Sequence, residues 1–126
     1  MPRDDAILLD LLRASRRAAE GRGGLSIAAF REDWKAQSIV LHQLLVLGEA
    51  VKRLSPGFRK AHPDISWRKM AGLRDILIHC YDTIDADTVW EIVDRDLPPL
   101  IAFLERVAPR RPEQGDSNPE GRRESP

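Results

Sequence analysis

Apolar residues recur at intervals of three and four along most of this chain, and this periodicity constrains the fold more than any other feature. It is clearest between residues 40 and 54, where one face of a helix would hold Val40, Leu44, Leu47, Val51 and Leu54. No segment alternates apolar and polar residues as a half-buried strand does. The sequence therefore predicts an all-α fold, an up-and-down bundle of four to five helices.

A second apolar stripe lies beside the first on the same segment and consists of Leu41, Leu45 and Gly48. One stripe is enough to place a helix in a monomeric bundle, so two stripes indicate burial over a wide arc. Two interpretations remain open. The helix is either the buried centre of the bundle or the seam of a homodimer.

Capping and helix-breaking residues set the expected helix boundaries. The first helix is predicted from Asp4 to Glu20, before a glycine-rich run at 21–24. Ser26 is placed to cap a long second helix that ends at about Leu54.

The second half of the chain continues in the same way. A loop is predicted over 58–65, followed by a third helix capped by Ser66. Asp85 or Asp87 caps a fourth helix that continues to about Ala108. Pro98-Pro99 must kink or restart this helix, because neither ring supplies an amide hydrogen.

The composition limits the class of protein. The 126 residues suffice for one domain, predicted over 1–108, and the tail at 109–126 has no aliphatic residue and should be disordered. No apolar run could span a bilayer and no signal peptide is recognisable, so we expect a cytoplasmic protein without membrane contact. The lone cysteine, Cys80, fits a reducing compartment. There is no zinc-ligand spacing and no glycine-rich phosphate loop, so we expect neither metal nor cofactor.

The formal net charge is zero, but charge is segregated along the chain. Between residues 52 and 79 the basic residues are Lys52, Arg53, Arg59, Lys60, Arg68, Lys69 and Arg74. Residues 82–96 are predominantly acidic. These segments are either two solvated faces or, because local potential steers a charged partner, the surroundings of a site for an anion.

Arg74, His79 and Tyr81 form the candidate site. Arginine is a permanent cation suited to phosphate, and histidine moves protons near neutral pH. On an ideal helix Arg74 and Tyr81 share a face, whereas His79 lies about 140° away from Arg74. The two groups meet if the helix frays near His79, or if a second copy of the chain brings its own residue across a two-fold axis. Taken singly, each side chain also fits a structural role, as a salt-bridge arginine, a surface histidine and a core-edge tyrosine.

Other candidate residues carry less information. Trp34, Trp67 and Trp90 are predicted to anchor the core rather than to stack on bases. His42 and His62 have no partner at ligand spacing and stay unassigned.

The pattern of Arg74, four residues, His79, one residue and Tyr81 resembles the signature of the HEPN superfamily, specifically its HepT-like toxins. Similarity extends over about residues 5–108. It includes Leu47–Ser55, His62–Trp67 followed by Ala71–Arg74, and Asp85–Val93 followed by Asp96–Leu100. Two positions depart from the common pattern. Asp75 stands where asparagine is common, and Cys80 stands where glycine is common.

The resemblance implies a homodimeric helical bundle that cleaves RNA without a metal, with transfer RNA among the candidate targets. It implies that Arg74 and His79 are the catalytic pair, with Asp75 as a supporting motif residue. It further implies a toxin–antitoxin system, in which a nucleotidyltransferase antitoxin silences the toxin by attaching AMP to Tyr81. Four cations of the basic segment are then expected to bind RNA phosphates, namely Lys52, Arg53, Arg59 and Lys60.

Two other hypotheses compete with this one. The chain is alternatively a catalytically silent helical partner of a nucleotidyltransferase, with Asp75 weakening the site. A purely structural dimerisation domain would explain the double stripe but leaves Arg74, His79 and Tyr81 without a purpose.

Overall fold

The computed structural model describes residues 2–77 and 85–109, and all regular secondary structure within these ranges is helical. This confirms the all-α prediction for the described part of the chain. His79, Cys80 and Tyr81 lie outside the described residues, as does the predicted tail apart from Pro109.

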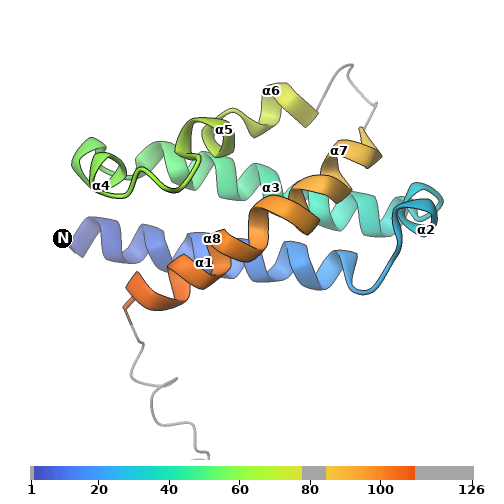
Figure 1. Cartoon of the computed structure of the whole chain (residues 1–126), viewed down its shortest axis with the longest axis horizontal. Coiled ribbons are helices and arrows are strands. Elements are labelled where there is room, and N and C mark those ends of the chain that lie inside the picture. The colour runs from blue at the N-terminus through green and yellow to red at the C-terminus, as the bar shows by residue number, and fades with distance from the viewer. Residues whose placement is uncertain (1, 78–84, 110–126) are drawn as a thin grey trace, which may run out of the picture.

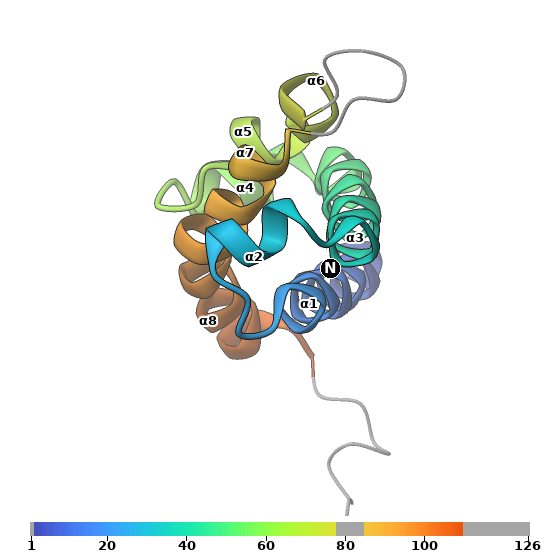
Figure 2. The same cartoon turned by 90° about the vertical axis from the view of Figure 1, so that its right-hand side faces the viewer.

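Two long helices, α1 (Pro2–Arg22) and α3 (Trp34–Arg53), form the base of the fold. They run antiparallel and pack against each other along their lengths, as both views show (Figures 1 and 2). The predicted stripe from Val40 to Leu54 lies in this core, and each of its five members is at most 1% exposed.

The second stripe of α3 is only partly covered. Leu41 and Leu45 are half-buried, and Gly48 is buried where α5 crosses α3. A Cβ atom at Gly48 would lie 2.8 Å from the backbone oxygen of Met70, so the close crossing requires glycine at this position. Farther out, Ile39 and Val46 are 52% and 38% exposed.

The helix predicted from Ser26 to Leu54 is interrupted, so that prediction is wrong in its continuity. α2 spans only Ile27–Arg31, and its N-terminus is capped by Ser26, whose hydroxyl accepts from the Ala29 amide at 3.1 Å. The chain then turns, and the Asp33 carboxylate accepts from the Ala36 amide at 3.0 Å to start α3. Asp33 is therefore a second N-cap within the predicted helix, and the turn before it allows Phe30 to be fully buried.

Two predictions for the middle of the chain are also corrected. The predicted loop at 58–65 begins inside a short helix, α4 (Pro56–Ala61), which Ser55 caps by accepting from the Phe58 amide at 3.2 Å. The predicted third helix is divided at Gly72 into α5 (Trp67–Ala71) and α6 (Leu73–Leu77), and Ser66 makes no capping hydrogen bond.

The last helical stretch is continuous and passes over both long helices. α7 (Ala86–Glu91) leads through a π-helical turn, η1 (Ile92–Asp96), into α8 (Leu97–Val107). In the π turn the Leu97 amide donates to the Ile92 carbonyl, one residue farther back than in an α-helix. The widened turn comes directly before Pro98, where an α-helix would clash with the ring and lose a hydrogen bond. The predicted irregularity at the prolines thus takes the form of a π turn.

The tryptophans divide into different environments. Trp67 is buried, with 6% exposure, and Trp90 is half-buried with its indole N–H donating to the Leu25 carbonyl at 2.9 Å. Trp34 is 69% exposed, so the prediction that it anchors the core is wrong. None of the helices in the described ranges is long and apolar enough to cross a membrane.

Candidate functional site

Arg74 and Asp75 lie on the exposed side of α6, and the opposite face of this helix packs against the core. Leu73 and Leu77, four residues apart, are fully buried and fix the orientation of the short helix. Arg74 and Asp75 consequently point away from the core, and the Arg74 guanidinium is accessible to a ligand.

The rest of the motif lies between two anchored ends. His79 and Tyr81 fall in residues 78–84, outside the described part, but the residues that flank this segment are in contact. The Asp85 amide donates to the Leu77 carbonyl at 3.4 Å, so the segment begins and ends at the same place. The anchoring of α7 therefore matters for the motif.

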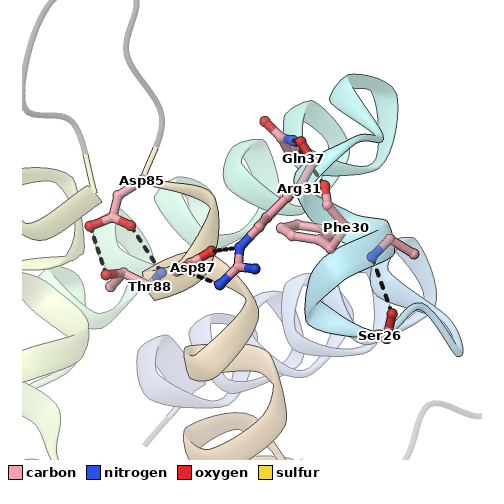
Figure 3. Close-up of polar contacts among 8 residues, drawn as sticks. Ser26, Phe30, Arg31, Gln37, Asp85, Asp87 and Thr88 are labelled. Atoms are coloured by element: carbon pink, nitrogen blue, oxygen red, sulfur yellow. Dashed lines mark hydrogen bonds and ion pairs between the residues drawn. The ribbon is translucent and has the colours of Figure 1, made fainter.

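Contacts with α2 hold α7 in place, as Figure 3 shows. The Arg31 guanidinium donates two hydrogen bonds to the Asp87 carboxylate, at 2.7 and 2.9 Å. Asp85 caps α7 by accepting from the Thr88 amide at 3.1 Å and from the Thr88 hydroxyl at 2.7 Å. The hydrogen bond with Arg31 lowers the pKa of the Asp87 carboxyl and raises the pKa of Arg31, so both groups stay charged near neutral pH.

Glu49 of α3 lies among the cations next to Arg74. Lys52 donates to its carboxylate at 3.0 Å. This hydrogen bond, together with the positive charges of Lys52, Arg74 and Arg53, lowers the pKa of the Glu49 carboxyl. The Glu49 carboxyl thus lies within electrostatic reach of Arg74 and has Lys52 as its direct hydrogen-bond partner. Sequence reasoning gave Glu49 no role, although the spacing of Glu49, Lys52 and Arg53 on one helix turn was a usable signal.

The four cations predicted to bind phosphate are divided between two places. Lys52 and Arg53 lie at the end of α3 and have acidic partners, Glu49 at 3.0 Å and Asp10 at 3.6 Å. Arg59 and Lys60 lie on α4 and line a different part of the surface, together with Arg68 of α5. Sequence reasoning counted Arg68 as part of the basic segment but did not assign it to a site.

The two unassigned histidines lie in different surroundings. His42 borders a groove of about 490 Å³ between α1 and α3, which Glu49 and Arg53 also line. The ring of His62 packs against Phe58 and Phe103, with centroids 4.5 and 5.0 Å away, which indicates a structural role. Within the described ranges, no three or more His, Cys, Asp or Glu side chains are grouped as metal ligands.

Comparison with known proteins places this geometry in a family. The model of the ribonuclease HepT-like family matches residues 11–107, a range that includes Arg74, His79 and Tyr81. The chain belongs to the HepT-like ribonuclease family.

Individual relatives agree with this HepT-like assignment. "Putative RNase MJ0127" of Methanocaldococcus jannaschii is 36% identical over 109 residues, which is 85% of this chain and 90% of the relative. "Probable ribonuclease HepT" of Thermococcus cleftensis is 40% identical over 75 residues, covering 60% and 68% of the two chains. "Putative RNase MJ1380" of M. jannaschii is 33% identical over 102 residues, covering 81% and 94%. No solved structure matches this HepT-like chain significantly.

Proposed function

We propose that this protein is an endoribonuclease that cleaves RNA without a metal, using Arg74 and His79. The observation that carries the proposal is the HepT-like family match, which spans a motif whose arginine, histidine and tyrosine are all present in this chain. The exposed position of Arg74 supports it, because a phosphodiester can reach its guanidinium from solvent.

The proposed chemistry is an intramolecular transesterification, in which a ribose 2′-oxygen replaces the 5′-oxygen on the adjacent phosphorus. His79 acts either as a general base that takes the proton of a ribose 2′-hydroxyl or as a general acid that protonates the leaving 5′-oxygen, and water accepts or supplies the other proton. The 2′-oxygen bonds to phosphorus while the bond from phosphorus to the 5′-oxygen breaks. Arg74 stabilises the negative charge that develops on the phosphate oxygens, and its fork donates two hydrogen bonds to them. Lys52, Arg53, Arg59 and Lys60 hold other phosphates of the RNA.

We further propose that the protein is the toxin of a toxin–antitoxin system and acts as a homodimer. A nucleotidyltransferase antitoxin would attach AMP to Tyr81, two residues from His79. The added phosphate is negatively charged and bulky, so it would repel RNA from a basic site and occupy the space beside the histidine. The intact mass of protein co-expressed with the antitoxin should show one adenylate per chain, and Tyr81→Phe should not gain it.

Substitution of the motif tests the catalytic assignment. Arg74→Ala and His79→Ala should each lower RNA cleavage by at least ~100-fold, the lower end of what one acid–base or oxyanion group contributes. Arg16→Ala is a matched control, because this exposed arginine pairs with Glu105 on the α1–α8 side of the bundle. A folded His79→Ala protein that cut RNA at the wild-type rate would refute the role of His79.

Asp75 favours a second candidate function, that of a catalytically silent partner of a nucleotidyltransferase. Its carboxylate is exposed directly beside Arg74 and opposes the approach of a phosphate. An active toxin should slow growth when expressed alone, whereas a silent partner should not. Growth inhibition that appears only in Asp75→Asn would show that the aspartate suppresses the activity.

A further inference from the structure

A shallow hollow between α4 and α5 gathers three cations that lie outside the motif. It encloses about 420 Å³, and its lining consists of Pro56, Arg59, Lys60, Trp67, Arg68 and Ala71. Three of these side chains are positively charged and none of those described is acidic. The hollow is therefore a compact source of positive potential on this side of the molecule.

The charges in the hollow are not compensated by the protein. Many other surface cations of the described chain have an acid within 4.0 Å, for example Lys69 with Asp96 at 2.7 Å and Arg31 with Asp87 at 2.7 Å. Arg59, Lys60 and Arg68 have no such partner among the described residues. The Nε atom of Arg59 is also buried without an acceptor in the described structure, which is unusual for a buried donor.

The walls of the hollow are fixed before any ligand binds. The Asp4 carboxylate accepts from the amide and the hydroxyl of Ser55 at 3.0 and 2.7 Å, and Ser55 in turn caps α4. At the other wall the Trp67 indole N–H donates to the His62 carbonyl at 2.9 Å, and the ring centroids of Trp67 and Phe58 lie 6.1 Å apart. Binding of an anion here would not require the backbone to become ordered, which favours affinity.

We propose that the hollow of Arg59, Lys60 and Arg68 binds neighbouring backbone phosphates of RNA, one for each cation, at some distance from the cleaved linkage. This inference rests on the proposed ribonuclease function and deepens it. Helices α4, α5 and α6 follow one another along α3 (Figure 1), so the hollow between α4 and α5 and the Arg74 position on α6 belong to consecutive elements. Arg68 and Arg74 are six positions apart, a span of at most about 20 Å.

The contacts would be independent of base sequence. Trp67 is buried with 6% exposure, so its ring is not a platform for base stacking. Charge is thus the property by which the hollow recognises its ligand. Lys52 and Arg53 lie outside the hollow and already have acidic partners, so they would contribute less to RNA binding than the hollow does.

The test measures how RNA affinity depends on salt, using full-length protein with His79→Ala so that the RNA is not cut. A fluorescent single-stranded RNA of about 16 nucleotides is titrated with protein at several salt concentrations, a length within the usual range for such proteins. Replacing Arg59, Lys60 and Arg68 by Gln should reduce the slope of log K against log salt by about 2, since each phosphate contact in single strands contributes about 0.7.

Two variants control for charge and for folding. Arg13→Gln, Arg16→Gln and Arg95→Gln together remove three cations that have acidic partners, and this variant should keep a steeper slope than the hollow variant. Lys60→Gln with Arg68→Gln changes only exposed side chains, so it should fold normally and reduce the slope by about 1.4.

The possible outcomes distinguish a failure of the inference about the hollow from a failure of the proposed ribonuclease function. A hollow variant with the slope of the arginine control overturns the inference, as does a parent protein that binds no RNA at low salt. An unchanged RNA slope with lost binding of the antitoxin would assign the hollow to an acidic protein instead. If the slope falls as expected but the protein with His79 intact does not cut RNA, the hollow stands and the ribonuclease proposal fails.

Discussion

Glu49 is a negative charge that interacts with three cations, Lys52, Arg53 and Arg74. Its carboxylate accepts a hydrogen bond from Lys52, and its lowered pKa keeps it ionised near neutral pH. In the protein without ligand it reduces the repulsion among Lys52, Arg53 and Arg74. When RNA binds, the same charge opposes the phosphate, so Glu49 balances stability of the free site against affinity.

Glu49→Gln should therefore strengthen RNA binding, by about two- to fivefold, the range expected for one exposed charge. Glu105→Gln removes an equal charge whose partner is Arg16 on the α1–α8 side of the bundle, and it should change the affinity less. Dissociation constants at one fixed salt concentration, in the His79→Ala protein, provide the measurement. Weaker binding by Glu49→Gln would mean instead that the carboxylate orients Arg74.

At the scale of the elements, periodicity predicted the helices well but not where they break. The stripe from Val40 to Leu54 is buried as predicted, because burial on one face is what produces the spacing. The break before Asp33 was not predicted, because aspartate also occurs on the exposed face of an uninterrupted helix. Its role as a cap becomes visible only when Phe30 is seen to be buried by the turn.

Gly48→Ala should destabilise the protein, although alanine is the better helix former. The new Cβ atom would lie 2.8 Å from the Met70 carbonyl oxygen, so α5 must move. Overpacking of this kind costs about 1–3 kcal/mol, against a propensity gain of about 1 kcal/mol. Gly57→Ala is the matched control, because a Cβ atom there meets nothing within 4 Å. Urea unfolding should show a loss for Gly48→Ala alone, and equal stability of the two variants would contradict the close crossing.

The Arg31–Asp87 pair should make the anchoring of α7 depend on pH. The pKa of Asp87 is lowered by its hydrogen bond with Arg31. Its stabilising contribution is therefore present above the ordinary pKa of aspartate and is lost as the pH falls through the lowered value. Asp87→Asn should reduce the free energy of unfolding modestly at about pH 7, and the difference from wild type should vanish towards about pH 2. Asp64→Asn, at an exposed position without an ion pair in the described structure, should show no such trend.

At the scale of the whole molecule, the sequence predicted a candidate site and a basic segment but not how the cations are divided. The basic segment was recognisable as a run of residues, and the motif by its resemblance to a family. Which cations are neutralised depends on contacts between distant parts of the chain, such as Arg53 with Asp10 and Lys69 with Asp96. These pairs join α1 to α3 and α5 to η1, and local sequence patterns do not encode such contacts.

Mixing two inactive variants should reveal whether a dimer shares its sites. If Arg74 of one subunit works with His79 of the other, a heterodimer of Arg74→Ala and His79→Ala has one intact site of two. After unfolding together and refolding, random pairing should then restore about one quarter of wild-type RNA cleavage. If each subunit contains a complete site, the mixture should stay as inactive as either variant alone. Sedimentation of the mixture checks that dimers have formed.

A backbone hydrogen bond of 3.4 Å joins the Asp85 amide to the Leu77 carbonyl, although the two residues are eight positions apart. When the ends of a loop are already together, doubling its length adds only about 0.6 kcal/mol to the free energy of closing it. An insertion after Tyr81 that keeps the spacing of the motif should therefore leave the packing of α6 and α7 intact.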